Sequence, residues 1–286
     1  MTTANVVFGD FSPFSTDFVS YVDSFNPVDG IPAERVRMAG TRIIPPLLGA
    51  LEEQGLRTVV GHDLRSAAYL FRSSGGRMKR LIQTNDPRYH PNATSADSVI
   101  IALMRGGVPQ GCVASRLLWC ERTLAEEMEN GQFWVSHPDS MWTQSDRCIV
   151  NAISAKAIRA CHVVFSGSIY LAQGATGGNT LAAMLRLHHL WVLCHWRWSW
   201  LVGIIEGALA RRHVFDVYGA MGLEMGIWRT RPGEGDDLHR YEMTTCEREA
   251  CMEQWLRPEI GQLSRPLGRP AVHLLPSERT RVDTDA

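Results

Sequence analysis

The chain has 286 residues, of which 45% are apolar and 21% charged, a composition typical of a globular protein with a sizeable core. Its formal net charge is −1, so it lacks the excess of basic residues with which nucleic-acid-binding proteins neutralise phosphates. The most apolar region, residues 181–209, contains six ionisable side chains, more than a membrane-spanning helix tolerates. We therefore predict neither a nucleic-acid partner nor a membrane span.

The seven cysteines are an odd number and include no Cys-x-x-Cys pair. Zinc sites need clustered thiolates or imidazoles, and disulfide frameworks are typical of small secreted chains. We therefore expect buried free thiols and no bound metal. The first ten residues lack a basic stretch followed by an apolar run, so no signal peptide is predicted and a cytoplasmic location is expected.

The first third of the chain is predicted to be an irregular arm followed by helices. Residues 1–30 show no sustained period, whereas 32–54 follow a helical pattern that a Pro-Pro pair is expected to kink. A second short helix is predicted at 63–72. Residues 85–97 are nearly all turn-formers and predict a loop.

A β-hairpin is predicted next. Residues 98–104 and 108–120 are apolar runs on either side of a Gly-Gly turn. A short helix should follow at 123–130, with Thr123 as N-cap and Glu126 completing a capping box.

The rest of the chain alternates strands and helices after an ambiguous segment at 147–153. The predicted strands are 160–171, 201–205, 224–230 and 271–275, and the predicted helices are 180–197, 207–218 and 245–256. This order indicates an α+β, α/β-like fold around one sheet.

The most informative local pattern is a glycine-rich turn, residues 173–179, between the 160–171 strand and the 180–197 helix. Glycines allow the backbone to approach a ligand closely, and the N–H groups at a helix start attract anions. A diphosphate is a natural occupant. The turn matches neither the P-loop nor the dinucleotide-binding fingerprint, so by itself it is weakly specific.

A second motif, Tyr218 followed by Gly-Ala-Met-Gly-Leu, lies 40 residues after Gly178. Together the two motifs resemble the GNAT superfamily of acyl-CoA-dependent N-acyltransferases, which has [RQ]-x-x-G-x-[GA] at a helix start and Tyr-x-x-x-Gly-Phe at the end of the next helix. Gln173, Gly178 and Tyr218 fit this pattern. Thr176 replaces the usual middle glycine, and leucine replaces the phenylalanine.

The resemblance covers about residues 98–232 and implies a GNAT-type mixed central sheet flanked by helices. The hairpin would supply its second and third strands and the 160–171 strand its fourth. Residues 1–97 would form an N-terminal helical extension that packs on this core, and 233–286 a C-terminal extension. We expect all three parts to form one compact unit.

The resemblance also implies a role for particular residues. Backbone groups of Ile169, Tyr170 and Leu171 would pair with the pantetheine arm of acyl-CoA as an added strand. The turn that would hold the diphosphate consists of Gln173, Gly174, Ala175, Thr176, Gly177, Gly178 and Asn179. Tyr218 would protonate the departing thiolate, which is chemically consistent because a phenol has a pKa of about 10. Core packing of Tyr218 is the competing interpretation.

A general base must also remove a proton from the attacking amine. We favour Glu206, because a carboxylate in an apolar stretch is expected to be buried and to need a partner. If Arg211 and Arg212 are that partner, its role is structural. His162, Glu121 and Glu126 are the alternatives, although half-buried, solvated or capping roles are common for such residues.

Residues 188–200 hold a cluster of three histidines and four tryptophans. His188 and His195 are seven residues apart, whereas a helical metal-ligand pair is usually four apart, so a packed aromatic helix is the better interpretation. No nucleophilic role is assigned to Cys194.

The expected function is transfer of an acyl group, acetyl in the first instance, from acyl-CoA to a primary amine by direct attack. One alternative is a long-chain N-acyl amino acid or homoserine-lactone-type synthase that uses acyl carrier protein. Another is a catalytically silent acyl-CoA-binding or scaffold protein, which is favoured by Thr176 in place of glycine, by Arg211 where the family often has asparagine, and by the lack of an assigned base. A third is an α/β protein whose turn binds nothing. The acceptor, an amine or an amino-acid-like molecule, would contact the N-terminal third and the loops 85–97 and 131–147. A homodimer is compatible with the sequence.

Overall fold

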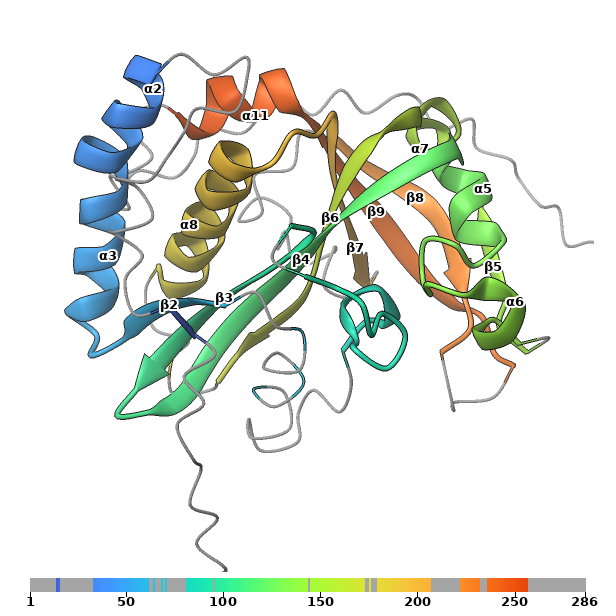
Figure 1. Ribbon diagram of the computed structural model, residues 1–286, viewed down its shortest axis with the longest axis horizontal. Helices are drawn as coiled ribbons and strands as arrows, with labels where there is room; N and C mark the ends of the chain where they lie inside the picture. The colour runs from blue at the N-terminus through green and yellow to red at the C-terminus, as the bar shows by residue number, and fades with distance from the viewer. Residues whose placement is uncertain are drawn as a thin grey trace, which may run out of the picture.

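The computed structural model describes residues 14–15, 33–61, 81–94, 96–143, 145–172, 179–206, 222–231 and 236–256, together with Leu64, Ala68, Leu70 and Ala175. The described strands form one nine-stranded sheet in the order β1-β2-β3-β4-β6-β7-β9-β8-β5 (Figure 1). Their bounds are Phe14–Ser15 (β1), Arg57–Gly61 (β2), Ser98–Arg105 (β3), Val108–Thr123 (β4), Cys148–Val150 (β5), Arg159–Leu171 (β6), Trp200–Glu206 (β7), Gly222–Arg229 (β8) and His239–Glu247 (β9).

Helices lie on both faces of this sheet. Their bounds are Ala33–Met38 (α2), Ile44–Glu52 (α3), Leu124–Glu129 (α5), Pro138–Met141 (α6), Ile153–Ala157 (α7), Thr180–His195 (α8) and Arg248–Trp255 (α11). In Figure 1, α2, α3, α8 and α11 cover one half of the sheet, and α5, α6 and α7 lie at the other. A mixed sheet flanked by helices confirms the predicted α+β fold class. Among the described helices, none has the length and apolarity needed to cross a membrane.

The long N-terminal helix is interrupted, as predicted. A π-helical turn, Ala39–Ile43, separates α2 from α3, and Pro45 and Pro46 occupy the first turn of α3, where a missing N–H costs no hydrogen bond. Strands β1 and β2 were not predicted. β2 pairs antiparallel with β3, and β1 pairs antiparallel with β2. The second predicted helix, at 63–72, is described only at Leu64, Ala68 and Leu70, all three helical.

The predicted hairpin is confirmed. β3 and β4 pair antiparallel from Ser98–Arg116 to Arg105–Val108. The intervening Gly106 and Gly107 have φ angles of +55° and +79°, which two-residue hairpin turns require and which glycine adopts without strain.

A β6–α8–β7 unit joins the two halves of the sheet. β6 pairs antiparallel with β4, and its other edge pairs parallel with β7 through Val163–Trp200, Val164–Leu201 and Phe165–Val202. This order of hairpin, strand, helix and parallel strand is the one that the GNAT resemblance implies.

One prediction for the second half of the sheet was wrong. Residues 245–247 were expected to begin a helix, but they end β9, and the helix α11 begins at Arg248. β9 lies between β7 and β8 and pairs antiparallel with both. The sheet thus contains strands from all three parts into which the sequence was divided.

Three clusters of buried side chains form the core. The largest lies between α3, α8 and α11 and the sheet, with Leu47, Leu190 and Trp255 among its members. The second lies on the opposite face, where α5 and α7 pack near β5 and β8. The third covers the same opposite face at the β2–β3 end.

The predicted capping box and the predicted free cysteines are both present. The α5 capping box is present, since Thr123 and Glu126 exchange side-chain-to-backbone hydrogen bonds of 3.2 and 2.9 Å. All seven cysteines are free, and all but Cys161 are buried. The predicted 207–218 helix and 271–275 strand lie outside the described residues.

Candidate functional site

The sheet splits between β6 and β7. Phe165 and Val202 are the last residues that pair across these parallel strands, although β6 continues to Leu171 and β7 to Glu206. Both strands stay paired on their outer edges, β6 with β4 and β7 with β9. The two inner edges of the described strands beyond this point therefore have no strand partner, and an extended ligand can supply the missing pairing.

A bulge in β6 lies beside the split. Ser168 has a φ angle of +53°, and the β4–β6 register shifts across it, between the pairs Cys112–Tyr170 and Ala114–Gly167. Its hydroxyl accepts hydrogen bonds from the Ile82 backbone N–H at 3.2 Å and from the Asn85 side chain at 3.4 Å. The segment that contains the 3-10 turn Gln83–Asn85 is thereby attached to β6 at the split.

The predicted pantetheine-binding residues follow this bulge. Ile169 and Leu171 are half-buried against the α8 side of the sheet, and Tyr170 is buried on the opposite side. All three lie on the part of β6 that is not paired with β7.

The predicted diphosphate turn is described only in part. Ala175 is buried and Asn179 is exposed at the start of α8, whereas Gln173, Gly174, Thr176, Gly177 and Gly178 lie outside the described residues. α8 begins without a side-chain cap and has no acidic residue in its first turn. The N–H groups and the positive dipole end at the N-terminus of this 16-residue helix can therefore bind an anion.

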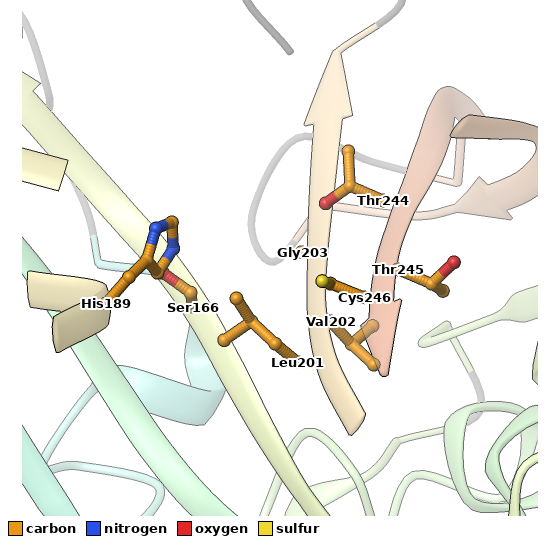
Figure 2. A pocket seen from close by; sticks show the side chains of 8 residues that line it. All are labelled: Ser166, His189, Leu201, Val202, Gly203, Thr244, Thr245 and Cys246. Carbon is orange, nitrogen blue, oxygen red and sulfur yellow. The ribbon is translucent and has the colours of Figure 1, made fainter. Parts of the chain in front are cut away.

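A small cavity lies at the base of the split (Figure 2). His189 of α8 and Ser166 of β6 line one side, and residues of β7 and β9 line the other. The β7 and β9 residues are Leu201, Val202, Gly203, Thr244, Thr245 and Cys246. The cavity has room for little more than one water-sized group.

The histidines of α8 pack in the core. His189 is 4% exposed and burial lowers its pKa to about 3, so its ring is neutral at physiological pH. His188 donates to or accepts from the Ser115 hydroxyl at 2.8 Å, and burial lowers its pKa well below the usual value. The predicted aromatic packing is confirmed, for example by the stacked rings of Trp191 and His195 at 3.9 Å.

The expectation that Glu206 is buried was wrong. Its side chain is 51% exposed at the end of β7 and forms an ion pair with Arg231, whose Nε also donates a 2.8 Å hydrogen bond to the Tyr241 hydroxyl. Glu206 ends the strand that borders the split, and its side chain lies on the face opposite α8 because it pairs in register with Tyr241. Arg211 and Arg212, the partners considered from sequence, lie outside the described residues, as does Tyr218.

The alternative bases are placed less favourably. His162 is exposed on β6 and contacts the Trp119 ring at a centroid distance of 4.9 Å, before the split begins. Glu121 is exposed near the end of β4. Glu126 is engaged by the Thr123 hydroxyl and backbone N–H of the capping box, which lower its pKa.

Several site residues were missed from the sequence because β9 was not predicted. Thr244 and Thr245 line the cavity, and Tyr241 holds Arg231 beside Glu206. Arg229, at the end of β8, is buried on the face that carries Glu206. Alternation of polar and apolar residues in 239–247 is weak, so no local signal identified this strand.

The fold is a mixed sheet flanked by helices, in which two adjacent parallel strands separate beyond Phe165 and Val202. No protein-family model matches the chain, and no curated protein matches it. Solved structures with a similar fold include FeeM, an N-acyl amino acid synthase from uncultured soil microbes (11% identity, TM-score 0.40, covering 68% of this chain and 93% of that one). Another is Mycobacterium smegmatis RimJ in complex with CoA-disulfide (10% identity, TM-score 0.38, covering 69% of this chain and 87% of that one). A third is Arabidopsis thaliana NAA60 in complex with acetyl-CoA (9% identity, TM-score 0.37, covering 67% of this chain and 97% of that one).

Proposed function

We propose that this protein is a GNAT-type N-acyltransferase that transfers an acetyl group from acetyl-CoA to a primary amine. The observation that carries the proposal is the split between β6 and β7, which begins after Phe165–Val202 and runs toward the glycine-rich turn and the start of α8. The order of the sheet and the sequence motifs around Gly178 and Tyr218 agree with it.

The donor would lie along the unpaired edge of β6. Backbone groups of Ile169, Tyr170 and Leu171 can pair with the amides of the pantetheine arm, as an added strand would. The diphosphate would lie at the turn and against the N–H groups of the first turn of α8. An uncapped helix start without acidic neighbours favours a dianionic group there.

The cavity at the base of the split would receive the acyl end. Its small size suits a methyl group better than a long chain. Its lining of Leu201, Val202, Gly203 and a neutral His189 suits an uncharged thioester. We therefore propose acetyl as the transferred group.

The reaction would be a direct attack. The amine nitrogen forms a bond to the thioester carbon, Glu206 takes a proton from the resulting ammonium, and the C–S bond breaks as Tyr218 protonates the sulfur. Glu206 is accessible and lies at the end of β7, and the ion pair with Arg231 orients its carboxylate.

Calorimetric titration of the purified protein with acetyl-CoA tests this proposal, with saturable binding as the expected result. Y218F should retain donor binding but lose most of the acetyl transfer measured against a panel of amines. Absence of binding at millimolar acetyl-CoA would remove the proposal, and binding without transfer to any amine would identify a silent acyl-CoA-binding protein instead.

A further inference from the structure

We propose that Arg229 binds an anionic group, a carboxylate or a phosphate, on the acceptor amine. This inference rests on the proposed acyl transfer and specifies its acceptor as an amine that carries an acidic group. The site consists of Arg229 and two tryptophans, Trp134 and Trp142, on the face of the sheet that carries Glu206.

Arg229 is held in place by aromatic rings. Its guanidinium carbon lies 3.7 Å from the centre of the Trp134 ring and 5.7 Å from that of Trp142. Trp134 is fully buried, and its indole N–H donates to the Met128 carbonyl at 2.8 Å, which fixes the plane on which the guanidinium rests. The cation is thus preorganised before any ligand binds.

Two donor nitrogens of the Arg229 guanidinium lack an acceptor among the described residues. Arg229 is 6% exposed, and its buried Nε and Nη2 have no hydrogen-bond partner among the described residues. No carboxylate in the described part of the chain forms an ion pair with it. The buried Arg116, by contrast, forms an ion pair with Asp97 at 2.6 Å, as a buried cation usually does.

The groups around Arg229 leave its charge intact. Burial lowers its pKa to about 10, so the side chain is still a cation at neutral pH. Tyr89, Tyr241, Cys148 and Asp146 face it from the neighbouring segments and partly oppose this shift. Oδ2 of Asp146 accepts hydrogen bonds from the Thr143 N–H and hydroxyl at 2.9 and 2.7 Å, and among the described residues Asp146 forms no ion pair with Arg229.

Its position relative to Glu206 matches a bifunctional acceptor. Glu206 pairs with Tyr241 and Tyr241 with Ile227, two residues before Arg229, so all four side chains share one face. Two strand spacings, about 10 Å, and a two-residue offset along β8, about 7 Å, place the Glu206 and Arg229 backbones roughly 12 Å apart. An acceptor with its amine at Glu206 and its anion several bonds away at Arg229 spans this distance, and the planar guanidinium can hold a carboxylate or phosphate through two parallel hydrogen bonds.

Initial-rate measurements with acetyl-CoA test this inference. The panel comprises ω-amino acids such as 4-aminobutyrate and 5-aminovalerate, aminoalkyl phosphates, and n-alkylamines of equal length. We expect kcat/KM to be at least tenfold higher for the anionic amines, and the two anionic series to show whether carboxylate or phosphate is preferred. The inference is overturned if plain alkylamines are used equally well.

Variants of Arg229 locate the effect. R229Q should remove the preference by raising KM for the anionic amines at least tenfold, without changing acetyl-CoA binding, and R229K should retain part of it. R248Q is the matched control. Arg248 is 9% exposed, and its Nε and Nη2 also lack hydrogen-bond partners in the described part of the chain, but it lies on α11. An unchanged preference in folded R229Q and R229K would overturn the assignment.

Binding measurements distinguish a failure of this inference from a failure of the proposed function. If acetyl-CoA does not bind the wild-type protein, the acyltransferase proposal fails, and calorimetric titration with 5-aminovalerate and 2-aminoethyl phosphate then tests Arg229 directly. Binding of either probe that is lost in R229Q supports the anion site, and no binding of either overturns it.

Discussion

Phe165 of β6 and Val202 of β7 form the last cross-strand pair before the two parallel strands separate. One residue further along, the Ser166 carbonyl oxygen lies 3.2 Å from the position that a Cβ would occupy on Gly203, and the Thr244 hydroxyl lies 2.7 Å from it. The absence of a side chain at Gly203 therefore keeps the base of the split narrow and the cavity open.

G203A should weaken acetyl-CoA binding about tenfold, because the added methyl group displaces the Thr244 hydroxyl and crowds the Ser166 carbonyl at the cavity. The dissociation constant is measured by calorimetry. G49A is the matched control, since a Cβ on Gly49 in α3 would meet no atom within 4 Å, and it should bind as the wild type does. Equal affinities for both variants would contradict the placement of the acyl group in this cavity.

E206Q should lower kcat about 100-fold while leaving acetyl-CoA binding unchanged, because an amide cannot take the ammonium proton. The rate loss should become smaller as the pH approaches the pKa of the free amine, where more of the acceptor is already deprotonated. E53Q, at the exposed C-terminal end of α3, is the control for loss of one surface carboxylate. A kcat of E206Q within twofold of wild type would assign the base to another group.

The free energy of unfolding should fall between pH 6.5 and pH 4. Burial lowers the pKa of His90 to about 4, while the Arg116 charge lowers it further and the Trp134 carbonyl, which accepts its Nε2–H at 3.0 Å, opposes the shift. A histidine with a lowered pKa in the folded state stabilises the fold above pH 6.5, and this contribution is lost as the pH falls toward 4.

The loss from His90 is on the order of 2 kcal/mol at pH 4.5, and His188 and His189 add losses in the same direction. Urea unfolding at pH 7 and pH 4.5 measures the total. H90Q can still donate to the Trp134 carbonyl, so it should show a smaller decrease than wild type. An identical decrease would mean that His90 is not the titrating group.

Thiol reagents should modify Cys161 first in the native protein. It is the one cysteine that is not buried. Partial burial raises the pKa of Cys161 as well, but the more deeply buried Cys120 has its pKa raised to about 12. Mass spectrometry after brief alkylation should show a single modification at residue 161, and seven after denaturation. C161S should remove the fast reaction. Rapid modification of Cys112 would contradict the packing of β4.

Features with strong local signals were predictable from the sequence. Two glycines between apolar runs determine the β3–β4 turn because they adopt positive φ angles without strain. The Thr123 and Glu126 pair determines where α5 begins, since both hydrogen bonds form within one helical turn. Each of the two motifs that carry the resemblance, one around Gly178 and one around Tyr218, likewise consists of contiguous residues.

Tertiary structure decided what depends on residues far apart in the chain. β9 has weak alternation, and its place between β7 and β8 comes from pairing with two strands that precede it. That pairing also brings Tyr241 and Arg231 to Glu206, which the apolar run before it had suggested was buried. Arg229 meets Trp134 only when β8 packs beside the α5 region, 95 positions earlier in the sequence. Contacts of this kind depend on the packing of the whole sheet, so they cannot be predicted from a short segment of sequence.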